Sequence, residues 1–189
     1  MRARCEKCHF HHSKCLCDVI VKINHQTPVI VIRYPKEAKH PFNTINIAKL
    51  NLILNIFDTE EVDSENELVD YLKKFKNPAL LFPIGECKDL SSTQNNEIDA
   101  LIILDGTWDK AKKIYFKSKF LQGLTKVKLN LDQISQYQIR KSNFPGGVSS
   151  IEAICYSLHL LEDNFPIEVA LKPFHFFVTK QIELAKKKE

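Results

Sequence analysis

The stretch Ala100-Leu101-Ile102-Ile103-Leu104-Asp105-Gly106-Thr107-Trp108 decides the fold class of this chain. Its first five residues are all apolar, which is typical of a strand buried on both faces, and the run stops at a polar turn. A second stretch, Leu80-Leu81-Phe82-Pro83-Ile84-Gly85-Glu86, has the same form. In open parallel sheets, ligands bind in the crevice at the carboxyl ends of the strands. We therefore expect both turns at the binding edge of one sheet.

Other apolar runs predict further strands, and helical spacing predicts the segments between them. Strands are expected at 28–33, 79–82, 100–104, 127–129 and 137–139. Helices are expected at about 43–57, 64–75, 109–121, 149–162 and 174–187. Because strands alternate with helices along the chain, the sequence predicts an α/β fold with a mostly parallel sheet and helices on both faces.

The length of 189 residues suits one such domain with a small appendage. We divide the chain into an N-terminal segment, residues 1–24, and a main domain, residues 25–189. No apolar run approaches the roughly 20 residues that span a bilayer, and no signal-peptide pattern stands at the start. These features predict a cytoplasmic protein with reduced thiols and no membrane partner.

Four cysteines stand in the first seventeen residues, spaced as Cys5-x2-Cys8-x6-Cys15-x-Cys17. Two close pairs of thiolates are a common way to surround a tetrahedral zinc ion. The alternatives are two disulfides or an iron–sulfur cluster, and the missing signal peptide argues against disulfides. The sequence therefore predicts a small zinc knuckle whose ligands are Cys5, Cys8, Cys15 and Cys17.

Positive charge is concentrated in two parts of the chain. Residues 110–131 contain seven lysines and no acidic residue, and basic residues also stand between the four cysteines. This distribution favours an anionic partner such as a nucleic acid. On the helix expected at 109–121, Lys110, Lys113 and Lys117 share one flank and are candidate phosphate contacts. The alternative for these lysines is a solvated helix face.

The turn after residues 100–104 contains candidate functional groups. Asp105 is an ionisable side chain at the tip of an apolar strand, Gly106 lets the backbone approach a ligand, and Thr107 can cap a helix. Trp108, the only tryptophan, either packs at the helix start or lines a pocket. The sequence contains neither a G-x-G-x-x-G fingerprint nor a Walker A motif, which excludes the usual dinucleotide and nucleotide signatures.

In combination, these motifs resemble the DTW-domain family. Asp105-Gly106-Thr107-Trp108, followed by Ala111, is similar to the family's D-x-T-W-x-x-A signature, and the cysteines are similar to its C-x2-C-x6-C-x-C segment. Further similarities lie at Glu37 with Asn43-Thr44, at 81–83, at 137–140 and at 149–153. The motifs follow in family order and cover most of the chain.

The resemblance implies a tRNA-uridine aminocarboxypropyltransferase related to the SPOUT superfamily. Such an enzyme moves the 3-amino-3-carboxypropyl group of S-adenosylmethionine to N3 of a tRNA uridine (acp3U formation) and releases methylthioadenosine. It also implies a SPOUT-like domain with a C-terminal trefoil knot, tRNA as the partner and a structural Zn2+. Monomer and homodimer both remain open.

Within this resemblance, Asp105 and Glu152 are the catalytic candidates. Asp105 either takes the uridine N3 proton or holds the amino group of S-adenosylmethionine. Glu152 is either a second base or an acid that complements a helix dipole. The expected S-adenosylmethionine contacts are Leu81, Phe82, Pro83, Gly85, Asp105, Gly106, Thr107, Trp108, Arg140, Ser149 and Ser150. The expected RNA contacts are Asn43, Thr44, Lys110, Lys113 and Lys117, although Asn43 and Thr44 are also ordinary helix-cap residues.

Two other functions fit the same sequence. One is a SPOUT-type RNA methyltransferase, which would use the same S-adenosylmethionine but transfer its methyl carbon. The other is a zinc-containing RNA-binding module without catalysis, which would not need the Asp105 turn or the helix start at Ser149.

Overall fold

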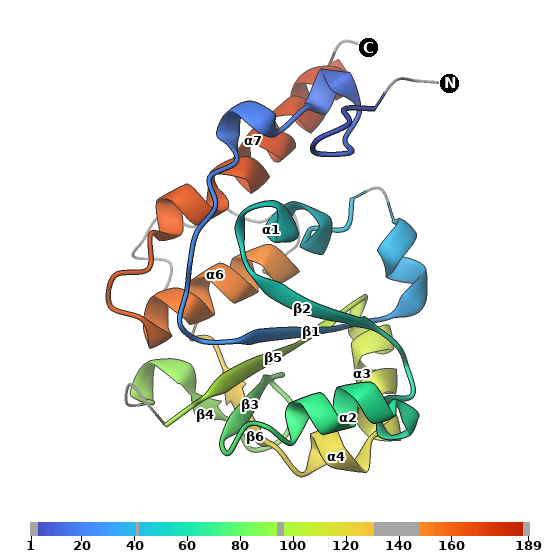
Figure 1. Ribbon diagram of the computed structural model, residues 1–189, viewed down its shortest axis with the longest axis vertical. Coiled ribbons are helices and arrows are strands. Elements are labelled where there is room, and N and C mark those ends of the chain that lie inside the picture. Colours follow the sequence, from blue (N-terminus) through green and yellow to red (C-terminus); the bar gives the residue numbers. More distant parts are fainter. Residues whose placement is uncertain (1–3, 41, 94–96, 131–147, 187–189) are drawn as a thin grey trace.

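The computed structural model of the protein describes residues 4–40, 42–93, 97–130 and 148–186 (Figure 1). A six-stranded sheet forms its centre, with strand order β2-β1-β5-β3-β6-β4. Every strand pairing in this sheet is parallel. The strands are β1 (Val29–Arg33), β2 (Leu54–Asp58), β3 (Pro78–Leu81), β4 (Lys88–Asp89), β5 (Ala100–Asp105) and β6 (Thr125–Lys128). The expected α/β fold with a parallel sheet is confirmed.

Helices cover both faces of this sheet (Figure 1). One face carries α1 (Ile45–Asn51), α6 (Ser150–Leu161) and α7 (Ile167–Lys186). The other carries α2 (Asn66–Leu72), α3 (Trp108–Lys117) and α4 (Lys119–Gln122). None of the described helices combines the length and the apolar character needed to cross a membrane.

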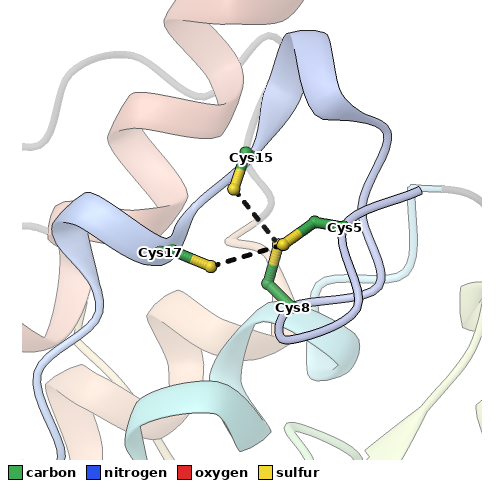
Figure 2. A group of neighbouring side chains, drawn as sticks. All are labelled: Cys5, Cys8, Cys15 and Cys17. Atoms are coloured by element: carbon green, nitrogen blue, oxygen red, sulfur yellow. Dashed lines mark hydrogen bonds between the residues drawn. The ribbon is translucent and has the colours of Figure 1, made fainter. Parts of the chain in front are cut away.

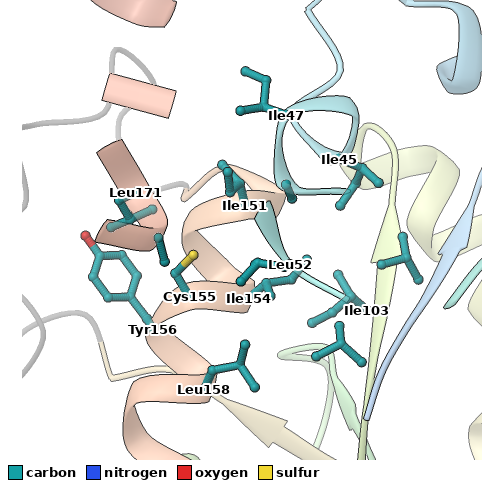
Figure 3. Packing of buried hydrophobic residues seen from close by; sticks show 14 of the residues in the cluster. Ile45, Ile47, Leu52, Ile103, Ile151, Ile154, Cys155, Tyr156, Leu158 and Leu171 are labelled. Carbon is teal, nitrogen blue, oxygen red and sulfur yellow. The ribbon is translucent and has the colours of Figure 1, made fainter. Parts of the chain in front are cut away.

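The two central strands are buried on both faces because their side chains alternate between two cores. On β5, Leu101 and Ile103 belong to the core under α1, α6 and α7, whereas Ile102 and Leu104 belong to the core under α2 and α3. Figure 3 shows the first of these cores, where side chains of α6 lie among those of α1 and β5. Burying one Leu or Ile side chain contributes roughly 1.5–3 kcal/mol, so these two strands anchor the sheet.

The segment after α1 differs from the sequence prediction. We expected one helix over about 43–57, but α1 ends at Asn51 and residues 54–58 form strand β2. The Asn51 side-chain amide donates to the Ala170 carbonyl at 2.8 Å, which ties the helix end to α7. Parallel pairing of β2 with β1 then satisfies the backbone groups that a longer helix would have satisfied internally.

Helix α7 also differs, because it begins at Ile167 rather than near Phe174 and contains Pro173. A proline inside a helix removes one backbone hydrogen bond and costs about 3 kcal/mol or more. Ala170, Leu171 and Pro173 are all buried against the core, and this burial offsets the cost.

Strand β4 was not predicted, and the other main helices and strands follow the prediction with small changes. The helix expected at 109–121 is divided into α3 and α4 at Ser118, and its predicted inward residues Ala111, Ile114, Tyr115 and Ser118 are all buried. The strand expected at 137–139 lies outside the described residues. The predicted trefoil knot depends on the path of residues 131–147, which also lie outside them, so the knot stays a prediction.

Candidate active site and metal centre

Asp105 lies at the carboxyl end of the central strand β5 and forms the centre of a buried polar cluster. Only 4% of the residue is exposed. Its Oδ2 accepts a hydrogen bond from Asn43 Nδ2 at 2.7 Å, and its Oδ1 accepts one from Ser150 Oγ at 2.5 Å. Asn43 precedes α1, and Ser150 is the first residue of α6. The structure thus brings three predicted site residues from three distant segments into direct contact.

Burial raises the pKa of Asp105 above its ordinary value of 3.8. The hydrogen bonds from Ser150 and Asn43 and the charge of Arg33 act in the opposite direction, and the charge of Glu37 adds to the rise. A carboxylate oxygen has two lone pairs. Because each oxygen of Asp105 uses one of them on a cluster donor, the side chain retains capacity to accept a further proton or donor.

Arg33 is a site residue that the sequence prediction missed. It is the last residue of β1, and its Cα lies opposite both Asp105 on β5 and Asp58 on β2. Its Nε and Nη2 donate to the two carboxylate oxygens of Asp58 at 2.6 and 3.0 Å, and its Nη1 donates to Asn46 Oδ1 at 3.2 Å. The signal in the sequence was a charged residue ending a strand that is otherwise apolar.

A second carboxylate, Glu37, lies beside the Asp105 turn. Lys110 Nζ pairs with Glu37 Oε1 at 2.6 Å and lies over the ring of Tyr34, 5.4 Å from its centroid. Gly106 allows this close packing, because a Cβ there would lie 3.1 Å from Lys110 Cβ and 3.5 Å from Tyr34 Cβ. Glu37 belongs to the motifs behind the family resemblance, but sequence reasoning did not assign it to the site.

Thr107 and Trp108 connect the Asp105 turn to α3. Thr107 is the N-cap of α3, and its hydroxyl accepts from Lys110 N. Trp108 is 48% exposed, so it is not a core residue. Its ring lies 4.9 Å from the Phe82 ring, and Lys112 Nζ lies 5.5 Å from its centroid. The contact with Phe82 joins the two turns that sequence analysis placed at one edge of the sheet.

The turn after β3 offers an apolar wall and one unusual backbone conformation. Phe82 is buried and also packs against Tyr115, with ring centroids 5.3 Å apart, while Leu81 is half-buried and Pro83 is exposed. Gly85 has a φ of +63°, in the left-handed region that glycine adopts without strain.

The helix start expected at Ser149 is confirmed, because α6 begins at Ser150. Ser149 is the N-cap, and Glu152 completes a capping box. Glu152 Oε2 accepts from the Ser149 backbone N at 2.8 Å and from Ser149 Oγ at 2.6 Å. The contacts of Glu152 in this structure are therefore those of a helix cap. Thr44 takes the N-cap position of α1 without a side-chain capping bond.

The three candidate lysines of α3 have acidic partners from earlier in the chain. Lys110 pairs with Glu37, Lys113 Nζ lies 2.5 Å from Glu60 Oε2, and Lys117 pairs with Glu61. These contacts lower the pKa of Glu60, chiefly through Lys113, and raise the pKa of Lys117, chiefly through Glu61. The lysine-rich stretch contains no acid of its own, so this neutralisation was not visible in the local sequence. Arg140 lies outside the described residues.

The four N-terminal cysteines converge on one point (Figure 2). Their sulfur atoms all lie within 4.8 Å of one another, with Cys5 to Cys17 at 3.5 Å and Cys8 to Cys15 at 3.8 Å. In a tetrahedral zinc site with Zn–S bonds of about 2.3 Å, the sulfurs are about 3.8 Å apart. The cluster therefore fits a four-thiolate metal centre.

The backbone around the cysteine cluster favours the thiolate form of Cys5. After Cys8 the chain turns through His9, which has a φ of 62°, and the His9 amide donates to the Cys5 carbonyl at 2.9 Å. The backbone N–H groups of Cys8 and Lys7 lower the pKa of Cys5 to about 6. The other sulfurs raise the pKa of Cys17 to about 12. A cation at the centre of the cluster would relieve this crowding of thiolates.

The cysteine cluster rests on α7. Leu16, between two ligands, is fully buried, and the Phe10 ring meets the Phe177 ring edge-on with centroids 5.3 Å apart. Lys14 Nζ donates to Gln181 Oε1 at 2.6 Å. The cysteine cluster is therefore joined to the main fold through the last helix, and it supplies neither of the side chains that donate to Asp105.

The chain was compared with protein-family models and with known proteins, and both comparisons found similarities. A family model described as "DTW domain" matches residues 2–182. A Drosophila melanogaster protein named tRNA-uridine aminocarboxypropyltransferase 2 is 26% identical over 191 residues, which cover 96% of this chain and 76% of the relative. A Macaca fascicularis protein of the same name is 25% identical over 195 residues, covering 96% and 64%.

A more distant similarity extends to plants. An Arabidopsis thaliana protein named tRNA-uridine aminocarboxypropyltransferase A is 25% identical over 199 residues, covering 86% of this chain and 74% of the relative. No solved structure matches the chain.

Proposed function

Because this chain belongs to the DTW-domain family, we propose that it transfers the 3-amino-3-carboxypropyl group of S-adenosylmethionine to N3 of a tRNA uridine. The observation that carries the proposal is the buried Asn43–Asp105–Ser150 cluster at the carboxyl edge of the parallel sheet. This edge is where open α/β sheets bind their ligands. The names of the relatives support tRNA as the substrate.

The reaction is a displacement at a carbon atom of the sulfonium. A bond forms between uridine N3 and Cγ of the amino-acid arm, and the Cγ–S bond breaks with its electron pair moving to sulfur. The products are acp3U in tRNA and methylthioadenosine, and the N3 proton passes to a base. Since the leaving thioether is neutral and stable, the protein's main tasks are to orient Cγ toward N3 and to remove that proton.

Asp105 has two proposed roles, and its environment supports each. As a base, it benefits from the raised pKa, because a general base works best when its pKa approaches the working pH. As an anchor, its carboxylate would pair with the α-ammonium of S-adenosylmethionine and place Cγ near the uridine. In both roles Asn43 and Ser150 fix the orientation of the carboxylate.

The remaining expected contacts define the proposed S-adenosylmethionine site. Phe82 and Trp108, in contact at 4.9 Å, supply aromatic surface between the two turns, with Leu81, Pro83, Gly85 and Gly106 nearby in sequence. The backbone N–H groups at the start of α6 and Arg140 are the proposed partners of the carboxylate of the substrate. The metal centre has a structural role in this proposal.

Isotope labelling tests the function and separates it from the two alternatives. The protein is incubated with tRNA and with S-adenosylmethionine labelled either in the carboxyl group or in the methyl group. We expect carboxyl label in tRNA and methyl label in methylthioadenosine. Methyl label in tRNA would instead assign a methyltransferase, and the absence of both labels from tRNA would leave an RNA-binding module.

The variant Asp105→Asn tests the site itself. We expect transfer to be lost while circular dichroism shows an intact fold, with Asp70→Asn, on the exposed surface of α2, as the matched control. Retained S-adenosylmethionine binding in Asp105→Asn would assign the base role, and lost binding would assign the anchor role. Full activity would exclude Asp105 from the mechanism.

A further inference from the structure

Phe42 is a large aromatic side chain that stays 53% exposed between the cysteine cluster and the Asp105 site. Its backbone amide donates to Nδ1 of His40 at 3.3 Å, and the two rings lie 5.9 Å apart. Aromatic side chains are enriched at binding interfaces relative to the rest of the protein surface. None of the contacts of the Asp105 cluster requires this ring.

The Phe42 ring contacts side chains from other parts of the chain, and these contacts fix its position. It meets the ring of Phe177 on α7 with centroids 6.4 Å apart, and Phe177 is itself held by Phe10. Lys14 Nζ lies 5.7 Å from the centroid of Phe42 and 5.9 Å from that of Phe177. Two other segments, the cysteine segment through Lys14 and α7 through Phe177, therefore hold this half-exposed ring in place, which lowers the entropy that a ligand must remove on binding.

The charge around Phe42 is positive. Lys36, Lys39 and His40 precede it and are exposed, and Lys14 lies over its ring. The acidic residue within this stretch, Glu37, already pairs with Lys110. Aromatic rings interleaved with cations are the usual surface for single-stranded nucleic acid, because bases stack on the rings while the cations contact phosphates.

The distance to the reaction site is set by the chain itself. The residue after Phe42 is Asn43, whose side chain donates to Asp105 at 2.7 Å. Consecutive Cα atoms are about 3.8 Å apart, so Phe42 stands at the rim of the Asp105 cluster. A base stacked on this ring would belong to a nucleotide close to the one whose base enters the site.

From these observations we propose that Phe42 is a stacking platform for an unpaired RNA base that flanks the reacting uridine, with Lys14 beside the adjoining phosphate. This inference rests on the proposed function for the identity of the RNA, and it names the surface by which that RNA is held. A target base has to leave its stack before it can react, which costs a few kcal/mol. Stacking of its neighbour on Phe42 would offset part of that cost and keep the strand in register.

Binding of fluorescently labelled tRNA, measured by anisotropy, tests the proposal. We expect Phe42→Ala to weaken tRNA binding on the order of tenfold, which lies within the range of roughly fivefold to more than a hundredfold for one base–aromatic stack. Phe42→Trp should restore the affinity because it also stacks, whereas Phe42→Leu, which is apolar but not aromatic, should not. The matched control is Ile53→Ala, which removes a 58% exposed apolar side chain just before the amino end of β2 and should leave the affinity unchanged.

The outcomes separate this inference from the proposed function. Unchanged tRNA affinity in Phe42→Ala would overturn it, and so would equal affinities of the Leu and Trp variants. A dimer that becomes a monomer in Phe42→Ala, seen by sedimentation with RNA affinity unaltered, would assign the ring to a contact between copies.

If the wild-type protein transfers no group but binds RNA through Phe42, the proposed function fails and the platform stands. Binding of tRNA by Asp105→Asn should still depend on Phe42.

Discussion

Asp105 is a buried carboxyl group, and its burial determines in which direction the stability of the folded protein changes with pH. Its pKa in the folded protein is raised above the ordinary value of 3.8, mainly by burial. Between pH 3.8 and the raised value, the folded state therefore binds more protons than the unfolded state. Stability contributed by this group falls as the pH rises through that window.

We therefore predict that wild type loses stability relative to Asp105→Asn as the pH rises from about 3.8, and that the difference becomes constant once Asp105 is ionised in both states. The measurement is the free energy of unfolding by urea at several pH values for both proteins. A difference that grows in favour of wild type over this range would contradict the burial of a charged Asp105.

The residues of the site could be predicted from the sequence, but the hydrogen bonds between them could not. Asp105, Asn43 and Ser150 were each predicted from strand-end, helix-cap and family patterns, and the structure joins them by hydrogen bonds. Arg33 and Glu37 were missed because their importance depends on strand register and on a partner far along the chain. Such pairings leave no local pattern in a single sequence.

Helix α6 begins with a capping box, and one of its two members is Glu152, a candidate catalytic residue. The Ser149 hydroxyl and backbone amide both bond to Glu152. We predict that Ser149→Ala lowers the free energy of unfolding by about 1 kcal/mol, the usual contribution of a helix N-cap. Glu152→Gln should leave stability nearly unchanged, because glutamine also completes a capping box.

Chemical denaturation measures the free energy of unfolding of both variants. The transfer assay then shows whether Glu152 also takes part in the reaction. If Glu152→Gln transfers the aminocarboxypropyl group at the wild-type rate, Glu152 acts only as a cap. A loss of transfer with unchanged stability would assign it a role in the reaction. A large loss of stability in Glu152→Gln would contradict the capping contacts themselves.

The proposed phosphate contacts on α3 can be tested, because Lys113 and Lys117 form ion pairs with glutamates. Glu60 pairs with Lys113, and Glu61 pairs with Lys117. If these lysines contact tRNA, phosphates must compete with the two glutamates. We predict that the double variant Glu60→Gln, Glu61→Gln binds tRNA more tightly, and that Lys113→Ala, Lys117→Ala binds it more weakly.

The salt dependence of tRNA binding gives the measurement. Each lost phosphate contact reduces the slope of log affinity against log salt by roughly 0.9 for a duplex and somewhat less for a single strand. Unchanged slopes and affinities in both double variants would show that the lysine flank of α3 faces away from the RNA.

The elements that were predicted least well are those whose ends depend on tertiary contacts. The apolar spacing after Asn43 fits a long helix, but pairing with β1 converts residues 54–58 into a strand. The last helix was expected to begin near Phe174, yet burial of the preceding turn extends α7 back to Ile167. The central strands were predicted well because unbroken apolar runs leave few alternatives.

In the folded protein, the segment that contains the four cysteines contacts α7 through Phe10 and Lys14. We predict that removal of the metal by a chelator lowers the melting temperature by several degrees and weakens tRNA binding, because the ligands and Phe10 lose their fixed positions. S-adenosylmethionine binding should persist, since the proposed site for it lies at the sheet edge.

Metal content by mass spectrometry, a melting curve and the tRNA titration check this prediction. Cys17→Ser should reproduce the effect of the chelator, whereas Cys87→Ser should not, because Cys87 lies outside the cluster and its thiol bonds to the Ile84 carbonyl at 3.3 Å. Equal melting temperatures with and without bound metal would contradict a structural role.

The contact between Lys14 and Gln181 joins positions 167 residues apart, and it gives the order of synthesis a consequence for folding. A ribosome makes the cysteine segment before α7, so the four thiols are present before the helix that they pack against. The apolar underside of that segment, including Leu16 and Phe10, stays uncovered until α7 emerges. A nascent chain interrupted before residue 167 would therefore expose apolar side chains of the cysteine segment that α7 otherwise covers, and exposed apolar surface of this kind is what chaperones bind.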